Sequence, residues 1–180
     1  PFHGTDGPIG VRRLFPDIWP GYTAAIMEAA KAEGFDYFED MNAQFEDGYF
    51  PVTISNIDDK RVSANVAYLT MEVRARPNFD ILDQAEVQRL NFDGTRLTGL
   101  TAKRPEGERT IRANEVIVSG GSTHSPAILM RSGVGPAAKL TQLGIGIVAD
   151  RAGVGQHLME HPGVSIASYM KRPARLPTGM

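Results

Sequence analysis

Apolar residues recur along the chain with two different periods, and each period predicts a different kind of element. Within residues 22–33, apolar side chains repeat at helical spacing, and Gly34 follows as a stop signal. A second helical face has the spacing i, i+4, i+7 and i+11 and consists of Val62, Val66, Leu69 and Val73. Arg76-Pro77-Asn78 ends this segment, because the residue before a proline is disfavoured in a helix. The pattern therefore predicts two helices, separated by an acidic and aromatic loop over residues 35–50.

Strand-like alternation follows in the middle of the chain. Apolar and polar side chains alternate, as in half-buried strands, within residues 79–90, 95–103 and 110–118. Asp93-Gly94 is a hairpin turn signal between the first two segments, and the polar loop 104–108 separates the last two. The third segment ends on Val116-Ile117-Val118, three consecutive β-formers that predict a short buried strand.

The residues after this strand predict a sharp turn into a helix. Gly120 and Gly121 let the backbone turn or approach a ligand closely. Ser125 is a good N-cap, Pro126 suits the first helical position, and Gly133 is placed to end the helix in a left-handed cap. A strand, a glycine turn and a helix N-terminus together offer free N–H groups and a positive dipole end to an anion such as a phosphate. The alternative is a corner of the fold that binds no ligand.

Composition narrows the classes of function. The chain has 180 residues, of which 42% are hydrophobic and 22% are charged, as is typical of a soluble globular protein. The net charge of -2 does not indicate binding to nucleic acid or to an acidic membrane surface, and no apolar run approaches membrane-spanning length. The absence of cysteine removes disulfides, thiolate metal sites and thiol nucleophiles. From its two ends, Pro1 and Met180, we expect a piece of a longer protein. The expected location is cytoplasmic.

The stretch from Gly121 to Gly135 carries the most specific pattern in the sequence. It reads Gly-Ser-Thr-His-Ser-Pro-Ala-Ile-Leu-Met-Arg-Ser-Gly-Val-Gly. These residues satisfy every fixed position of the second signature of the glucose–methanol–choline (GMC) family of flavin-dependent oxidoreductases, so the chain resembles the middle of a member of that family. Further segments that resemble the family are residues 4–8, 40–42, 61–69 and 153–162, the last with His157 and Glu160 where Asn and Asp are usual.

This resemblance implies an enzyme that oxidises a small-molecule alcohol with FAD. In the family, a hydride passes from the alcohol carbon to flavin N5 while a histidine takes the hydroxyl proton. That histidine lies near the C-terminus of family members, beyond Met180, so the resemblance implies no catalytic residue in this chain. The cofactor contacts that it implies are the backbone of Val87, at the adenine, and the turn formed by Ser119, Gly120 and Gly121. The alternative for Val87 is a valine of the hydrophobic core.

The resemblance also implies the fold and its division. The expected fold class is α/β, the central part of a Rossmann-like FAD-binding domain together with part of a substrate-binding domain. Residues 1–60 are expected in the substrate-binding domain, 61–162 in the FAD-binding domain, and 163–180 return to the substrate-binding domain. The remaining segments of the same polypeptide are expected as partners, and neither nucleic acid, nor a membrane span, nor a metal is expected.

Two histidine motifs suggest other chemistry. His157-Leu158-Met159-Glu160-His161 fits His-x-x-Glu-His, a zinc hydrolase signature that needs both histidines on one helix with Glu160 as base. Pro162 and Gly163 follow at once and disfavour that helix, and no Asp or Glu follows Glu160 as a third ligand, so we expect a structural role. His124 lacks the Gly-x-Ser-x-Gly context of a nucleophile elbow, and we expect it in a turn.

Two alternative functions stay open. Some relatives on the same flavin scaffold split cyanohydrins, so one alternative is a hydroxynitrile lyase. The other is a non-catalytic fragment or binding module. A flavin absorbance band that an alcohol bleaches favours the oxidoreductase, an unbleached flavin favours the lyase, and the absence of flavin favours the fragment.

Overall fold

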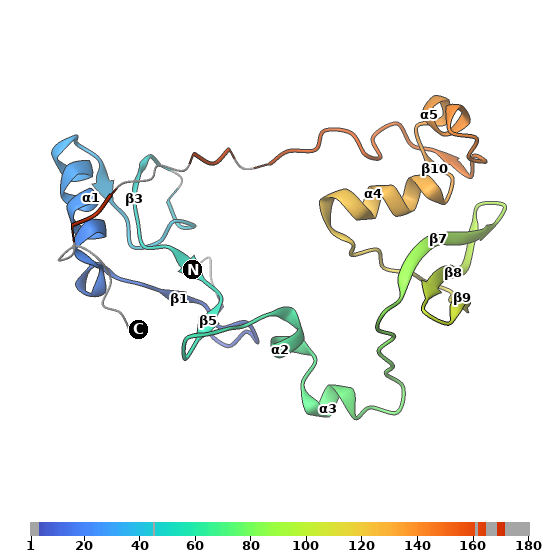
Figure 1. Cartoon of the computed structure of the whole chain (residues 1–180), viewed down its shortest axis with the longest axis horizontal. Coiled ribbons are helices and arrows are strands. Elements are labelled where there is room, and N and C mark those ends of the chain that lie inside the picture. Colours follow the sequence, from blue (N-terminus) through green and yellow to red (C-terminus); the bar gives the residue numbers. More distant parts are fainter. Residues whose placement is uncertain (1–3, 45, 161, 165–168, 172–180) are drawn as a thin grey trace. The chain divides into compact units, whose positions relative to one another are not determined.

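A computed structural model describes residues 4–44, 46–160, 162–164 and 169–171. The chain forms two compact units: unit 1 consists of Pro1–Asp80 with Ser165–Met180, and unit 2 consists of Ile81–Val164. Figure 1 labels the elements of both units. The first boundary between the units lies after residue 80, and the predicted division into binding domains at residues 60 and 162 stays a prediction. Which unit binds flavin and which binds substrate stays a prediction.

Unit 1 is built from short strand pairs around one longer helix. The antiparallel pairs are β1 (Arg12–Arg13) with β4 (Thr53–Ile54) and β5 (Asn56–Ile57) with β6 (Lys60–Arg61), and the parallel pair is β2 (Asp36–Tyr37) with β3 (Gly48–Tyr49). Helix α1 (Gly21–Ala32) follows the short 3-10 helix η1 (Pro16–Ile18). The helix predicted over residues 22–33 is thereby confirmed, and Gly34 follows it with a left-handed φ of +87°.

The helix predicted over residues 62–73 is instead two short helices, α2 (Ala64–Tyr68) and α3 (Met71–Arg74). Ser63 caps α2, and Thr70 caps α3 by accepting the Val73 N–H at 3.4 Å. The prediction of one helix was wrong because a threonine hydroxyl that accepts a nearby backbone N–H starts a new helix at that point.

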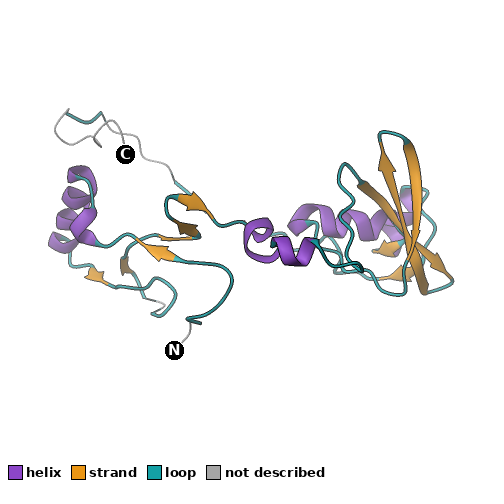
Figure 2. Ribbon diagram, turned by 90° about the horizontal axis from the view of Figure 1, so that it is seen from below, coloured by secondary structure: helices purple, strands orange, loops and turns teal. Residues whose placement is uncertain are grey.

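Unit 2 contains a three-stranded antiparallel sheet with the order β7-β8-β9, seen as the long orange strands in Figure 2. Its strands are β7 (Glu86–Asp93), β8 (Arg96–Arg104) and β9 (Gly107–Arg112). The predicted hairpin at Asp93-Gly94 is confirmed, and Gly94 has the positive φ, +58°, that such a tight turn requires. The first and third strands are shorter than predicted: β7 begins only at Glu86, and β9 already ends at Arg112.

Two helices and a second small sheet complete unit 2. Helix α4 (Gly121–Arg131) packs against β7. Strand β10 (Val134–Gly135) pairs in parallel with β11 (Ala149–Asp150), and α5 (Ala137–Gln142) lies between them in sequence. The buried hydrophobic residues are Leu90 of β7, Ala102 of β8 and Leu140 of α5.

The buried strand predicted at residues 116–118 is not found. The segment has no regular secondary structure, and Ile117 is 82% exposed. A strand needs neighbouring strands to accept and donate its backbone hydrogen bonds, and no described segment pairs with these residues. The β-forming sequence is present, but the sheet that it needs is not supplied by the described part of the chain.

Candidate cofactor-binding site

Helix α4 begins at the glycine turn, with Gly120 as its N-cap, five residues before the predicted N-cap Ser125. The Gly120 N–H donates to the Ser125 hydroxyl at 2.9 Å, so the serine caps the helix from inside its second turn and not from the Ncap position. Pro126 consequently lies within the helix. His124, predicted in a turn, is an exposed helical residue for the same reason. At the other end, Gly133 has a φ of +86° and confirms the predicted left-handed cap.

The residues Ser119, Gly120 and Gly121 form an exposed turn that leads into this helix, and Gly121 is its first residue. The two glycines differ in what they permit. Gly121 has a φ of +80°, which disfavours any other residue, and a Cβ atom there would meet nothing within 4 Å. Gly120 has a φ of −82°, which every residue adopts, but its Cβ would lie 3.2 Å from the Cβ of His124. A substitution at Gly121 would therefore strain the backbone, whereas a substitution at Gly120 would bring the new side chain against His124.

Val87 lies near the opposite end of α4. It pairs with Ala102 across the sheet and is half-buried, and its carbonyl oxygen accepts a hydrogen bond from Arg131 Nη2 at 3.2 Å. Helix α4 has 11 residues, which at 1.5 Å per residue corresponds to about 16 Å. The structure therefore does not bring the four predicted contact residues together, but arranges them at the two ends of one helix.

A hollow of about 470 Å³ adjoins the glycine turn. Its wall combines one side of α4 with the loop 155–159; the residues are Ser122, Thr123, Pro126, Met130, Gly155, Gln156, His157, Leu158 and Met159. A Cβ atom at Gly155 would lie 3.1 Å from Met130 Cε, so the two segments pack closely. Two stretches that resemble the family signatures thus meet at one place.

The loop 155–159 has no helix, and His157 has a φ of +54°. The helical geometry that the zinc hydrolase signature needs is therefore absent there, and His161 lies outside the described residues. Among the residues that the structure describes, no group of three or more His, Asp or Glu side chains could hold a metal ion.

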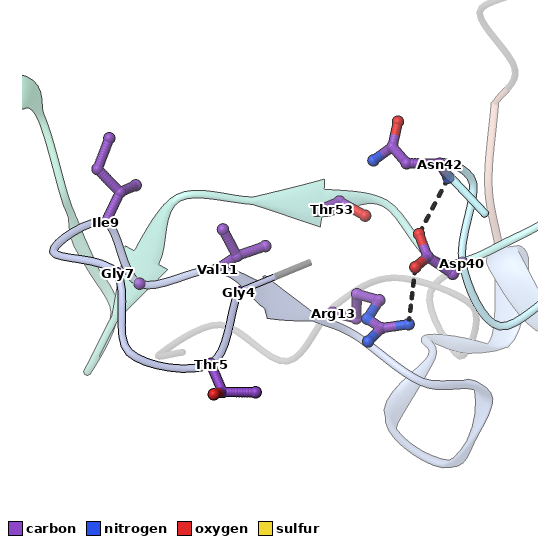
Figure 3. A pocket seen from close by; sticks show the side chains of 10 residues that line it. Gly4, Thr5, Gly7, Ile9, Val11, Arg13, Asp40, Asn42 and Thr53 are labelled. Atoms are coloured by element: carbon purple, nitrogen blue, oxygen red, sulfur yellow. Dashed lines mark hydrogen bonds and ion pairs between the residues drawn. The ribbon is translucent and has the colours of Figure 1, made fainter. Parts of the chain in front are cut away.

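Unit 1 has a hollow of its own, of about 600 Å³, shown in Figure 3. Asp40 lies at its wall and accepts the Asn42 N–H at 3.0 Å, while its other oxygen lies 3.7 Å from Arg13 Nη1. The same Arg13 nitrogen donates to the Glu39 carbonyl at 3.0 Å. The Asp-x-Asn spacing thus forms an Asx turn that Arg13 ties to β1, and this arginine had no signal in the sequence.

Comparison with known proteins identifies the family. A family model described as GMC oxidoreductase matches residues 2–163. The chain belongs to the GMC oxidoreductase family, a family of FAD-dependent oxidoreductases.

Two curated relatives match nearly the whole chain. The 5-(hydroxymethyl)furfural oxidase of Methylovorus sp. (strain MP688) is 39% identical over 175 residues, which cover 97% of this chain and 33% of that protein. The oxygen-dependent choline dehydrogenase of Burkholderia multivorans is 38% identical over 178 residues, which cover 97% of this chain and 31% of that protein. The chain therefore spans about a third of the length of these relatives.

Solved structures agree with the expected fold class. The pyridoxine 4-oxidase from Mesorbium loti superimposes with a TM-score of 0.75 and 32% identity, over 82% of this chain and 29% of that chain. The α/β fold class of an FAD-binding GMC protein is confirmed. No helix in the described part of the chain is long and apolar enough to cross a membrane.

Proposed function

We propose that this chain is the central portion of an FAD-dependent enzyme that oxidises an alcohol, with the catalytic histidine supplied by another segment. The observation that carries the proposal is the arrangement along helix α4. An exposed glycine turn stands at its N-terminus, and the half-buried Val87 lies beside its C-terminus. A dinucleotide is an elongated molecule with a base at one end, and two contact regions at opposite ends of a helix about 16 Å long suit it.

The residues at the turn fit the phosphate-containing middle of FAD. The helix N-terminus has unpaired N–H groups and a positive dipole end that favour a negative charge. One N–H group, that of Gly120, is already used by Ser125, so the groups that follow it in the first turn of α4 are the available donors. The open space at the Gly121 Cα allows a ligand to approach the backbone directly.

In such an enzyme, the bound flavin supplies the hydride acceptor. The residues of this chain hold that cofactor: the turn 119–121 binds its phosphates, and the backbone of Val87 binds its adenine. We therefore assign binding and orientation to this chain, and no proton transfer.

The choice of an alcohol as substrate is supported by the names of three relatives, which refer to 5-(hydroxymethyl)furfural, choline and pyridoxine. A structural neighbour is named formate oxidase, with a TM-score of 0.75 and 28% identity. The donor must therefore be identified by measurement.

The test is a visible spectrum of the chain co-expressed with the flanking segments of its polypeptide, followed by anaerobic addition of alcohols. We expect a flavin band that at least one alcohol bleaches. A band that no alcohol bleaches, with turnover of a cyanohydrin, would replace the proposal with the lyase. A protein that folds without any flavin would support the remaining alternative, the non-catalytic fragment.

A further inference from the structure

Two consecutive carbonyl groups of β7 face helix α4. Val87 stands opposite Ala102 and Arg89 stands opposite Thr101, so Gln88 is an extra residue that forms a bulge in β7. Successive carbonyl groups of a regular strand point to opposite sides. At the bulge, the carbonyls of both Val87 and Gln88 instead accept hydrogen bonds from one side chain of α4, that of Arg131.

The Arg131 guanidinium contacts the two carbonyls with two different nitrogens. Its Nε donates to Gln88 at 2.8 Å and its Nη2 donates to Val87 at 3.2 Å. Because the guanidinium is planar and rigid, this fork fixes the spacing and direction of the two carbonyl groups. The next residue, Ser132, accepts the Leu90 N–H at 2.8 Å. The end of α4 therefore clamps the backbone of β7 at three points.

We propose that Arg131 is a positioning residue for the adenine end of FAD, acting through the backbone of Val87. This inference rests on the proposed function, which assigns the adenine to Val87. A carbonyl oxygen has two lone pairs, so the oxygen that accepts from Arg131 retains one for the exocyclic amino group of adenine. The arginine holds that oxygen in the direction in which the base can reach it.

The test measures the dissociation constants of two probes for the flavin-free protein, with all flanking segments present. The probes are FAD and its analogue with unsubstituted purine in place of adenine, which lacks the exocyclic amino group and keeps N1 as an acceptor. The variants are Arg131→Met, which removes the donors, and Arg131→Lys, which keeps the charge without the fork. The matched control is Arg109→Met: Arg109 is exposed on β9 and stands opposite Ala102, in the same row across the sheet as Val87.

We expect the unchanged protein to prefer FAD over the analogue about tenfold, the worth of one good hydrogen bond. Arg131→Met should weaken FAD binding about tenfold and bring both probes to equal affinity, because a Val87 carbonyl that is no longer held in place does not bond the amino group that distinguishes the two probes. The preference of Arg131→Lys for FAD over the analogue should lie between those of the unchanged protein and Arg131→Met. Arg109→Met should keep the full preference. Arg131 is exposed, so its loss leaves no buried charge. If Arg131→Met fails to fold, the preference of Arg131→Lys for FAD over the analogue tests the inference instead.

Other results overturn the inference. If Arg131→Met weakens both probes by the same factor, or neither, Arg131 does not act through the base. If the unchanged protein binds both probes equally, the adenine is not read at Val87, although the cofactor proposal survives. If it binds neither probe, the proposed function itself fails.

Discussion

At the scale of single residues, Ser132 joins helix α4 to the sheet through one hydroxyl. Its oxygen accepts the Leu90 N–H at 2.8 Å and donates to the Ile128 carbonyl at 2.6 Å, and the residue is 8% exposed. Ser132→Ala leaves the buried Leu90 N–H without a partner, which should lower the free energy of unfolding by about 1–3 kcal/mol. Urea denaturation measures this, with the exposed Ser122→Ala as control. Equal stability of the two variants would contradict the assigned bonding.

Gly120 is the most closely packed residue of the turn at which we expect the cofactor phosphates to bind. Gly120→Val should abolish FAD binding, because its φ of −82° tolerates valine while a Cβ atom would lie 3.2 Å from the Cβ of His124 and 3.3 Å from the Ser125 nitrogen, so that the side chain displaces the first turn of α4. The control is Gly146→Val, since a Cβ at Gly146 would meet nothing within 4 Å. Flavin absorbance of the purified variants gives the occupancy. A folded Gly120→Val protein with full occupancy would remove this turn from the site.

At the scale of elements, the end of α4 depends on a glycine that has no room for a side chain. Gly133 has a φ of +86°, and a Cβ there would collide with the Gly146 carbonyl oxygen. Gly144 is left-handed as well, with a φ of +69°, but has open space around it. Gly144→Ala should therefore cost only the backbone strain of about 1–2 kcal/mol, whereas Gly133→Ala should cost about 1–3 kcal/mol more, as overpacking does. Thermal unfolding of the two variants compares them; similar losses would argue against the close contact.

The elements that the sequence predicted correctly depend on local signals. Helix α1 has its apolar period and Gly34 within one segment, and the β7–β8 hairpin is defined by Asp93-Gly94. The start of α4 was misplaced because the Ser125 hydroxyl accepts the Gly120 N–H from within the helix. An N-cap side chain usually accepts an N–H two or three residues after it, so the serine was taken as the N-cap. The strand at 116–118 failed because its existence depends on distant partners.

For the site, the contact region 119–121 was predicted from its glycines and from the resemblance to the family, and it stays a prediction. Arg131 was not predicted, because the signature leaves its position free and its role arises from a bulge more than forty residues earlier. A bulge is set by the pairing of two strands, and no local pattern of apolar residues indicates it.

At the scale of the whole molecule, the chain alone is expected not to oxidise alcohols. It spans about a third of the length of its relatives, and we expect the catalytic histidine and further cofactor contacts in the other segments. Loss of a general base alone lowers a rate by about 10² to 10⁴. The isolated chain should purify without stoichiometric flavin, and activity should follow co-expression with those segments. Oxidation of an alcohol by the isolated chain, with bound flavin, would contradict this.

The uncovered segment 116–118 has a consequence for handling the protein. In the described sheet, β9 has a neighbour on one side only, but Glu108, Arg109 and Arg112 place charges along it, and charges discourage pairing with strands of other molecules. Residues 116–118 carry no charge themselves and are preceded by a single charged residue, Glu115; their exposed member is Ile117, and short apolar β-formers without charge are prone to aggregate. Precipitation of the separately produced chain should therefore begin there. Ile117→Lys should raise its soluble yield, whereas the same substitution in the exposed, already charged strand β9, at Thr110, should change little.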